Sequence, residues 1–177
     1  MLCRVVALSV VAFLLSGCVT ERSGLEFSAM SQKVGPPKVG QARVVVFREK
    51  AYGGIFDEGW NVKLDGEQLS DLKTGTYVYE DRPAGSHELI STVTLFPGVT
   101  RRDFTAAAGR TYFFLARPSE RSQKLNTATA VGGLTGFFVA SAMTAYDDNP
   151  GPLDFFPIEE TSARAMLTDL RLAQPSH

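Results

Sequence analysis

The sequence predicts a mainly β protein: an antiparallel β-sandwich of about seven strands, with a glycine-rich apolar helical insertion and a short C-terminal helix. Short runs rich in Val, Phe, Tyr and Thr are separated by Gly, Pro and Asp at fairly even intervals, which is typical of sandwiches and barrels. A later stretch lacks charged residues and repeats small residues at every fourth position, and the last segment has a helical apolar period.

The first strands are predicted on either side of a tight turn. Residues 42–47 (ARVVVF) have the β-branched density of a buried strand, and residues 60–64 alternate between apolar and polar. Asp65-Gly66 is a preferred two-residue hairpin turn. Residues 67–72 are therefore expected to return as the partner strand.

Four further strands are expected at 76–80, 87–96, 99–105 and 111–116. Pro97-Gly98 is expected to form the turn between the strands 87–96 and 99–105. No helical pattern lies between these segments. Consecutive strands joined by short turns pair antiparallel, so the sequence predicts antiparallel sheets.

The insertion covers residues 128–146 (ATAVGGLTGFFVASAMTAY), which include no charged residue. Small residues recur at Ala128, Gly132, Gly136, Ala140 and Thr144, a ladder that lets another backbone approach a helix closely. Such a helix could cover a sheet, enter the membrane or pair with copies of itself. Its Gly, Thr and Ser content keeps the hydrophobicity modest, which favours packing or self-association over insertion.

The C-terminal part begins after a proline-rich break. Residues 153–158 (LDFFPI) are expected to form an edge strand. Residues 159–172 have the spacing of an amphipathic helix, with Ala163, Met166 and Leu167 among the residues on its apolar side.

The N-terminus has the pattern of a secretory signal over residues 1–17. Arg4 is followed by an apolar run of eleven residues, shorter than the about 20 that a spanning helix needs. The run closes on Leu-Ser-Gly-Cys at positions 15–18, which resembles the lipobox of bacterial lipoproteins. The resemblance implies cleavage between Gly17 and Cys18 and lipidation of Cys18; the alternative is an ordinary cleavable signal. Several acyl chains on one cysteine would anchor the protein stably in a membrane.

Residues 18–40 are predicted to be the lipidated cysteine and a flexible linker, because they are polar and have no sustained apolar period, and residues 41–177 to be the folded domain. Cys3 and Cys18 are the only cysteines, so cleavage leaves no thiol pair for a disulfide or a metal site. The precursor has 18 basic and 19 acidic residues, which gives no basic surplus for binding nucleic acid.

The strand pattern resembles a bacterial family, domain of unknown function 2846, that occurs mostly in envelope lipoproteins. The residues that carry the resemblance are Ala42-Arg43-Val44, Phe47-Arg48, Gly53-Gly54, Val62-x-Leu64-Asp65-Gly66, Leu72-x-x-Gly75-x-Tyr77, Pro83-Ala84-Gly85-x-His87, Tyr112-x-Phe114, and Glu160-x-x-Ala163 with Leu170. The hairpin and its Pro-x-Gly-x-His turn are also similar to PEGA-type surface modules. The resemblance implies a β-sandwich and no particular reaction.

Catalytic and metal sites lack the necessary residues. His87 and His177 are the only histidines, so neither a Ser-His-Asp triad nor a histidine-based zinc site is expected, and His87 is expected to be structural. The acidic residues after the insertion, including Asp147 and Asp154, do not have the spacing of an EF-hand loop. The sequence therefore predicts no catalytic residue, no metal site and no cofactor.

A candidate binding loop surrounds two glycines. It comprises Tyr52, Gly53, Gly54, Ile55, Phe56 and Trp60. The glycines free the backbone, and the large apolar side chains would be costly to leave in water unless a partner covers them. Packing of the aromatic residues within the fold is the alternative interpretation.

These features predict a membrane-anchored envelope lipoprotein with a non-catalytic binding or structural role. The expected partners are the membrane, through the N-terminal lipid, and an envelope protein or a second copy of the chain. Val19 follows the cysteine where aspartate would resemble an inner-membrane retention signal, which favours the periplasmic face of the outer membrane. The alternatives are an oligomer-forming or membrane-interacting lipoprotein that acts through residues 128–146, and a hydrolase that uses carboxylates near Asp57 or Asp65.

Overall fold

The computed structural model describes residues 24–50, 59–93, 96–145 and 151–173. In chain order the elements are α1 Phe27–Val34, β1 Gln41–Arg48, β2 Trp60–Leu64, β3 Glu67–Leu72, β4 Thr76–Pro83, β5 Gly85–Val93, β6 Phe96–Ala106, β7 Thr111–Pro118, α2 Glu120–Met143, β8 Leu153–Ile158, α3 Glu160–Leu167 and β9 Arg171–Leu172.

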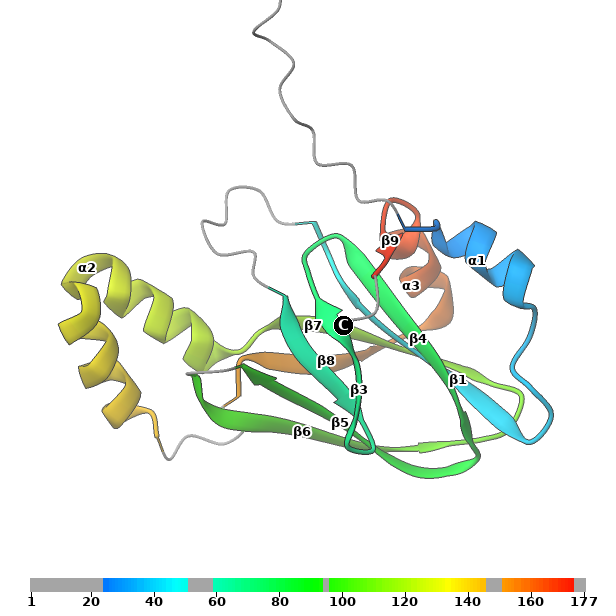
Figure 1. Cartoon of the computed structure of the whole chain (residues 1–177), viewed down its shortest axis with the longest axis horizontal. Coiled ribbons are helices and arrows are strands. Elements are labelled where there is room, and N and C mark those ends of the chain that lie inside the picture. The colour runs from blue at the N-terminus through cyan, green and yellow to red at the C-terminus, as the bar shows by residue number, and fades with distance from the viewer. Residues whose placement is uncertain (1–23, 51–58, 94–95, 146–150, 174–177) are drawn as a thin grey trace, which may run out of the picture.

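The strands form two sheets that pack face to face, as the predicted sandwich requires (Figure 1). One sheet has the order β8-β7-β1-β4-β9 and the other the order β3-β2-β5-β6. The helices α1 and α3 lie on the outer side of the five-stranded sheet, whereas α2 projects from one end of the sandwich (Figure 1). The mainly β fold is therefore confirmed.

Strand β1 lies at the centre of the five-stranded sheet and is buried on both faces, because alternate side chains of a strand point to opposite sides. Val44 and Val46 pack into the layer between the sheets. Val45 and Phe47 pack on the other side, under the helices. This double burial explains why the strand is an unbroken apolar run.

Two apolar cores result from this arrangement. The core between the sheets consists of Val44, Val46, Val62, Leu64, Leu72, Val78, Leu89, Phe114, Ala116, Leu153 and Phe155. The core between the five-stranded sheet and the helices consists of Phe27, Met30, Val45, Phe47, Tyr77, Phe113, Leu115, Ala163, Leu167 and Leu170. The fold thus has three layers: helices, mixed sheet and antiparallel sheet.

The expectation of purely antiparallel sheets is wrong for two strand pairs. Strand β1 pairs parallel with β7, with Arg43 opposite Thr111, and β4 pairs parallel with β9. Five strands, β2 to β6, lie between β1 and β7 in the chain. The chain crosses to the other sheet and back twice over this distance, so the long connection that a parallel pair needs is available without an intervening helix.

Local turn chemistry predicts most of the remaining pairings correctly. Asp65 and Gly66 both have positive φ, of 54° and 84°, and join β2 to β3. Strand β8 lies at a sheet edge, as expected. The turn expected at Pro97-Gly98 is wrong, because both residues lie within β6, an edge strand in which proline is tolerated.

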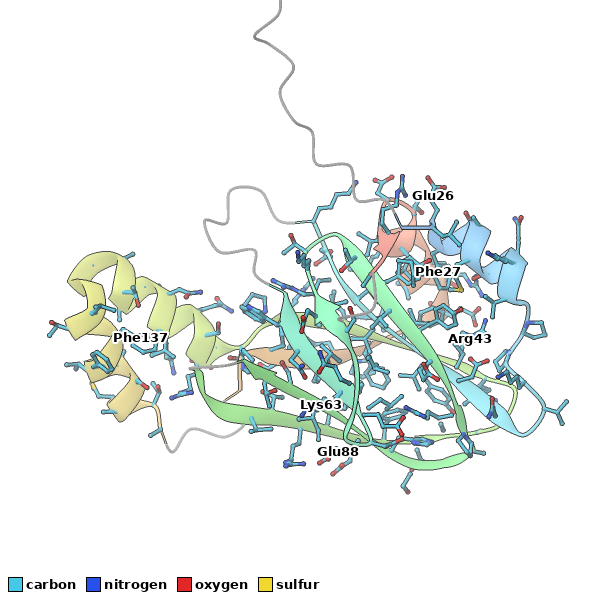
Figure 2. All side chains as sticks on the ribbon, in the orientation of Figure 1. Glu26, Phe27, Arg43, Lys63, Glu88 and Phe137 are labelled. Carbon is cyan, nitrogen blue, oxygen red and sulfur yellow. The ribbon has the colours of Figure 1, made fainter. Side chains whose placement is uncertain are left out.

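The expected linker over residues 18–40 is wrong for its second half, because α1 belongs to the fold. Phe27 and Met30 are buried against the five-stranded sheet (Figure 2). The Tyr77 hydroxyl donates a hydrogen bond to the Leu25 carbonyl over 3.1 Å, and Nη1 of Arg43 donates to the carbonyl of Gly35 over 2.7 Å. Residues 27–34 therefore belong to the folded domain and not to a linker.

The C-terminal helix is shorter than the predicted range 159–172. It ends at Leu167, and β9 follows as a short strand beside β4. The amide of Arg171 donates to the Gly75 carbonyl and the amide of Leu172 to the Leu25 carbonyl, over 3.1 and 2.8 Å. These bonds to the sheet edge and to the segment before α1 replace the helical bonds that the last predicted turn would make.

Candidate functional site

The most unusual surface of the protein is on α2, which is a bent pair of helical arms and not one straight helix (Figure 1). Gly133 has φ 58° and ψ −147°, a conformation outside the helical region and favourable for glycine. The bend divides α2 into arms of residues 120–132 and 134–143 that fold back on each other. The predicted insertion is thus helical, but it starts earlier and is broken at its second glycine.

The small residues of the predicted ladder bring the two arms together. A Cβ added at Gly136 would overlap the carbonyl oxygen of Ala128, so the two backbones touch at this point. Ala140 is half-buried and Thr144 is buried, whereas Gly132 is exposed. The close backbone contact that the ladder predicts is therefore made at Gly136, between the two arms of the hairpin. The small residues do not form one continuous exposed face.

Hydrogen bonds fix the base of the hairpin to the sandwich. The Ser119 hydroxyl accepts from the Ser122 amide over 3.0 Å, as an N-cap, and donates to the Gly151 carbonyl over 2.6 Å. Nε of Arg121, in the first arm, donates to the Thr144 hydroxyl after the second arm over 2.9 Å. The two arms are joined at their base, so the hairpin has a defined direction relative to the sheets.

The outer side of the hairpin is apolar and open to solvent. Its large apolar side chains, here called the apolar hairpin surface, are 55–88% exposed: Val131, Leu134, Phe138, Val139 and Met143. They make up half of the exposed large apolar side chains in the described part of the chain. A monomeric soluble domain rarely gathers such side chains unless a partner covers them.

The hairpin offers few polar groups to compete with an apolar partner. No charged residue occurs between Lys124 and Asp147. The hydroxyls of Thr127 and Thr129 donate to the backbone carbonyls four residues earlier, over 2.9 and 2.7 Å. Hydroxyls bonded within their own helix cost less to move out of water than unpaired ones.

Of the predicted binding loop, Tyr52, Gly53, Gly54, Ile55 and Phe56 lie outside the described residues. Trp60 is the exception: it begins β2 and is partly buried against the inter-sheet core. The Arg48 guanidinium lies 4.6 Å from the centre of the Trp60 ring.

Gly17 and Cys18, the predicted cleavage and lipidation residues, also lie outside the described residues.

A hollow of about 520 Å³ surrounds His87 and is lined by Phe104 and by the acidic residues Asp65, Glu88 and Asp103. His87 Nδ1 lies 2.8 Å from Oδ2 of Asp65, and Nε2 lies 2.8 Å from the Pro83 carbonyl oxygen. Each ring nitrogen therefore lies within hydrogen-bond distance of a protein oxygen. The geometry gives His87 the structural task of joining the β2–β3 turn to the end of β4.

Of the carboxylates that the sequence offered for catalysis or metal binding, Asp57 and Asp147 lie outside the described residues, whereas Asp65, Glu67 and Asp154 are described. Asp65 accepts hydrogen bonds from the Glu88 amide and faces His87, and Glu67 pairs with Arg82 over 2.6 Å. Burial, and secondarily the charge of Glu120, raises the pKa of Asp154. Within the described residues no three His, Cys, Asp or Glu side chains are close enough to hold a metal ion.

Sequence reasoning found the right segment for the exposed surface but not its shape. The signal was present: Gly133 directly follows the ladder residue Gly132 near the middle of the charge-free stretch, and a pair of glycines permits a sharp bend of a helix. Within the described residues, no helix has the length and hydropathy of a membrane span.

A family model described as protein of unknown function (DUF2846) matches residues 38–134, which is more than half of the chain. The match extends from the segment before β1 through β7 and across the first arm of α2. A search of curated proteins gives no match to this chain.

Proposed function

The chain belongs to the DUF2846 family, and on that premise we propose that it is a lipid-anchored lipoprotein of the bacterial cell envelope that acts by binding and not by catalysis. The observation that carries the binding role is the apolar hairpin surface, whose large side chains are exposed at the end of a projecting hairpin. The sandwich supplies a rigid support, because two cores and the hydrogen bonds at Ser119 hold the hairpin in place.

The anchor is proposed from the sequence around Cys18. A short positive region, an apolar run and Leu-Ser-Gly-Cys at positions 15–18 together fit a lipoprotein signal. Val19 in place of aspartate supports the periplasmic face of the outer membrane as the final location. The second cysteine of the precursor, Cys3, lies inside the segment that cleavage would remove.

The contacts of the candidate catalytic residues also support a binding role. The ring nitrogens of His87 are both engaged, and the carboxylates of Asp65 and Glu67 face a histidine and an arginine. Glu88, which lines the same hollow, pairs with Arg101 over 2.8 Å. These contacts support a structural role for this end of the sandwich.

The anchor is tested by labelling growing cells with a radioactive fatty acid. The wild-type protein and Cys3→Ser should incorporate the label and sediment with the outer membrane, whereas Cys18→Ser should remain unlabelled and uncleaved by the lipoprotein signal peptidase. Cys3→Ser is the matched control, because it removes the other cysteine of the precursor. Retention of the label in Cys18→Ser, or a wild-type protein without label, would contradict the proposal.

A further inference from the structure

We propose that the apolar hairpin surface inserts into the lipid surface that carries the anchor, so that the domain is held at two points and lies along the membrane. This inference names the partner of the binding surface and rests on the proposed lipid-anchored function. The proposed partner is the acyl region of a bilayer, which is apolar, uncharged and without hydrogen-bonding groups.

The chemistry of the hairpin matches that partner. The apolar hairpin surface combines aliphatic and aromatic side chains, and no charged residue occurs from Leu125 to Tyr146. Charged residues occur at the base, where Lys124 pairs with Glu120 over 3.0 Å. This division suits entry of the uncharged end of the hairpin into the hydrocarbon, with the charges at its base left at the level of the headgroups.

The length of the hairpin suits entry into one leaflet. The second arm, residues 134–143, is about 15 Å long at about 1.5 Å per residue. The hydrocarbon core of a bilayer is about 30 Å thick, so an arm of this length reaches about halfway across it. The turn at Gly133, with Val131 and Leu134 on either side, would enter first.

The docking of α1 brings the lipid surface within reach. Only residues 19–23 separate Cys18 from Gly24, the first described residue. At about 3.3–3.6 Å per residue, the chain from Cys18 to Gly24 spans about 20 Å when fully extended. A long linker would have allowed the domain to stand well away from the bilayer, whereas this short one keeps it close.

The arrangement of the two attachment points predicts the orientation. Helix α1, which follows the tether, and α2 lie toward opposite ends of the long axis of the molecule (Figure 1). When both the acyl chains and the hairpin are in the same bilayer, the long axis lies along its surface.

A second copy of the chain is the competing occupant, and the hairpin geometry disfavours it. Helices associate closely through small residues, where their backbones can meet. Here Gly136 already meets the backbone of Ala128 in the other arm, and Phe137 is half-buried on the hairpin (Figure 2). The side chains that remain outside are large and exposed, as lipid contact requires.

The test uses the mature chain with Cys18→Ser, so that no acyl chain contributes, and vesicles of phosphatidylethanolamine and phosphatidylglycerol. The unacylated chain should co-float with the vesicles. Val131→Ser combined with Leu134→Ser should weaken this partition at least about tenfold, or about 1.4 kcal/mol. The matched control combines Val34→Ser with Val39→Ser, two exposed apolar positions outside the hairpin, and should partition like the parent chain.

A single change, Phe138→Ser, provides a second variant, and each variant is compared with its parent by circular dichroism to confirm that the sheets fold. Absence of partition by the parent chain would overturn the inference, as would equal losses in the hairpin and control variants. A dimer formed without vesicles and abolished by the hairpin variants would overturn it in favour of a second copy. Fatty-acid labelling of Cys18 is measured separately. If Cys18 is labelled but the unacylated chain does not bind vesicles, the lipid anchor stands and only the insertion of the hairpin is refuted.

Discussion

The substitution Phe27→Ala tests whether α1 is docked on the sheet or belongs to the flexible linker that the sequence pattern predicts. The Phe27 side chain is 5% exposed and makes edge-on contacts with the rings of Tyr77 and Phe113, at 5.5 and 5.9 Å between ring centres. The Arg164 guanidinium covers the same ring at 5.6 Å. Truncation of a buried phenylalanine to alanine typically costs about 3–5 kcal/mol, so Phe27→Ala should lower the free energy of unfolding by this order.

The assay is denaturant unfolding of the mature chain with Cys18→Ser, followed through the fluorescence of Trp60, the single tryptophan. Val34→Ala on the same helix is the control, because Val34 is 40% exposed and its truncation should change stability by less than about 0.5 kcal/mol. Limited proteolysis gives a second readout, since an undocked α1 should be cleaved before the sheets. If Phe27→Ala and Val34→Ala both leave the free energy of unfolding almost unchanged, the docking of α1 is refuted and the interpretation of residues 18–40 as a flexible linker stands.

Three further changes test other parts of the structure. Gly136→Ala should destabilise the hairpin by about 1–3 kcal/mol, because the added methyl group overlaps the backbone of Ala128, whereas Gly132→Ala, which meets no atom, should be neutral or stabilising in thermal unfolding. Asp154→Asn should stabilise the protein at neutral pH: burial and then Glu120 raise the pKa of Asp154, so its contribution to stability is present at low pH and lost as the pH rises through the folded-state pKa. The melting temperatures of Asp154→Asn and wild type should converge below the ordinary pKa of 3.8, and a constant difference at all pH values would contradict this cause. His87→Ala should cost about 0.5–1.5 kcal/mol in chemical unfolding, because it removes the hydrogen bonds between the ring nitrogens and the Asp65 and Pro83 oxygens; an unchanged midpoint would exclude the structural role.

The sequence predicts the strands well because each is specified by local features. The apolar run of β1, the alternation in β2 and the Asp65-Gly66 turn are all properties of a few consecutive residues. Pairing between β1 and β7 depends on which distant strands meet, and the sequence pattern contains no direct signal for it. The antiparallel expectation was therefore reasonable for neighbouring strands and wrong for this pair.

Helix α1 is missed for a different physical reason. It has only eight residues, of which Phe27 and Met30 are buried, so the apolar period is too short to stand out against a polar, proline-rich background. Its position depends on tertiary contacts, chiefly with Tyr77 and Phe113. Short helices of this kind form because the rest of the fold is present, and not from their own propensity.

The candidate site is predicted in part. The charge-free composition of residues 128–146 marks the segment, and the small residues indicate close helix contact. Composition does not say that the contact at Gly136 is with the opposite arm of the same hairpin, because that depends on the reversal at Gly133. Once the ladder is used internally, the large apolar residues must face outward, and this consequence follows only from the three-dimensional arrangement.

The most direct test of two-point membrane attachment is fluorescence quenching in the acylated mature protein, reconstituted in vesicles that contain lipids with a quencher on the acyl chain. Acylation of Cys18 leaves no free thiol in the mature chain, so a fluorophore can be placed on a single new cysteine at Leu134→Cys or at Val39→Cys. We predict strong quenching at position 134 and weak quenching at position 39. Weak quenching at position 134 with the anchor intact would contradict the account, because the hairpin would then lie outside the bilayer.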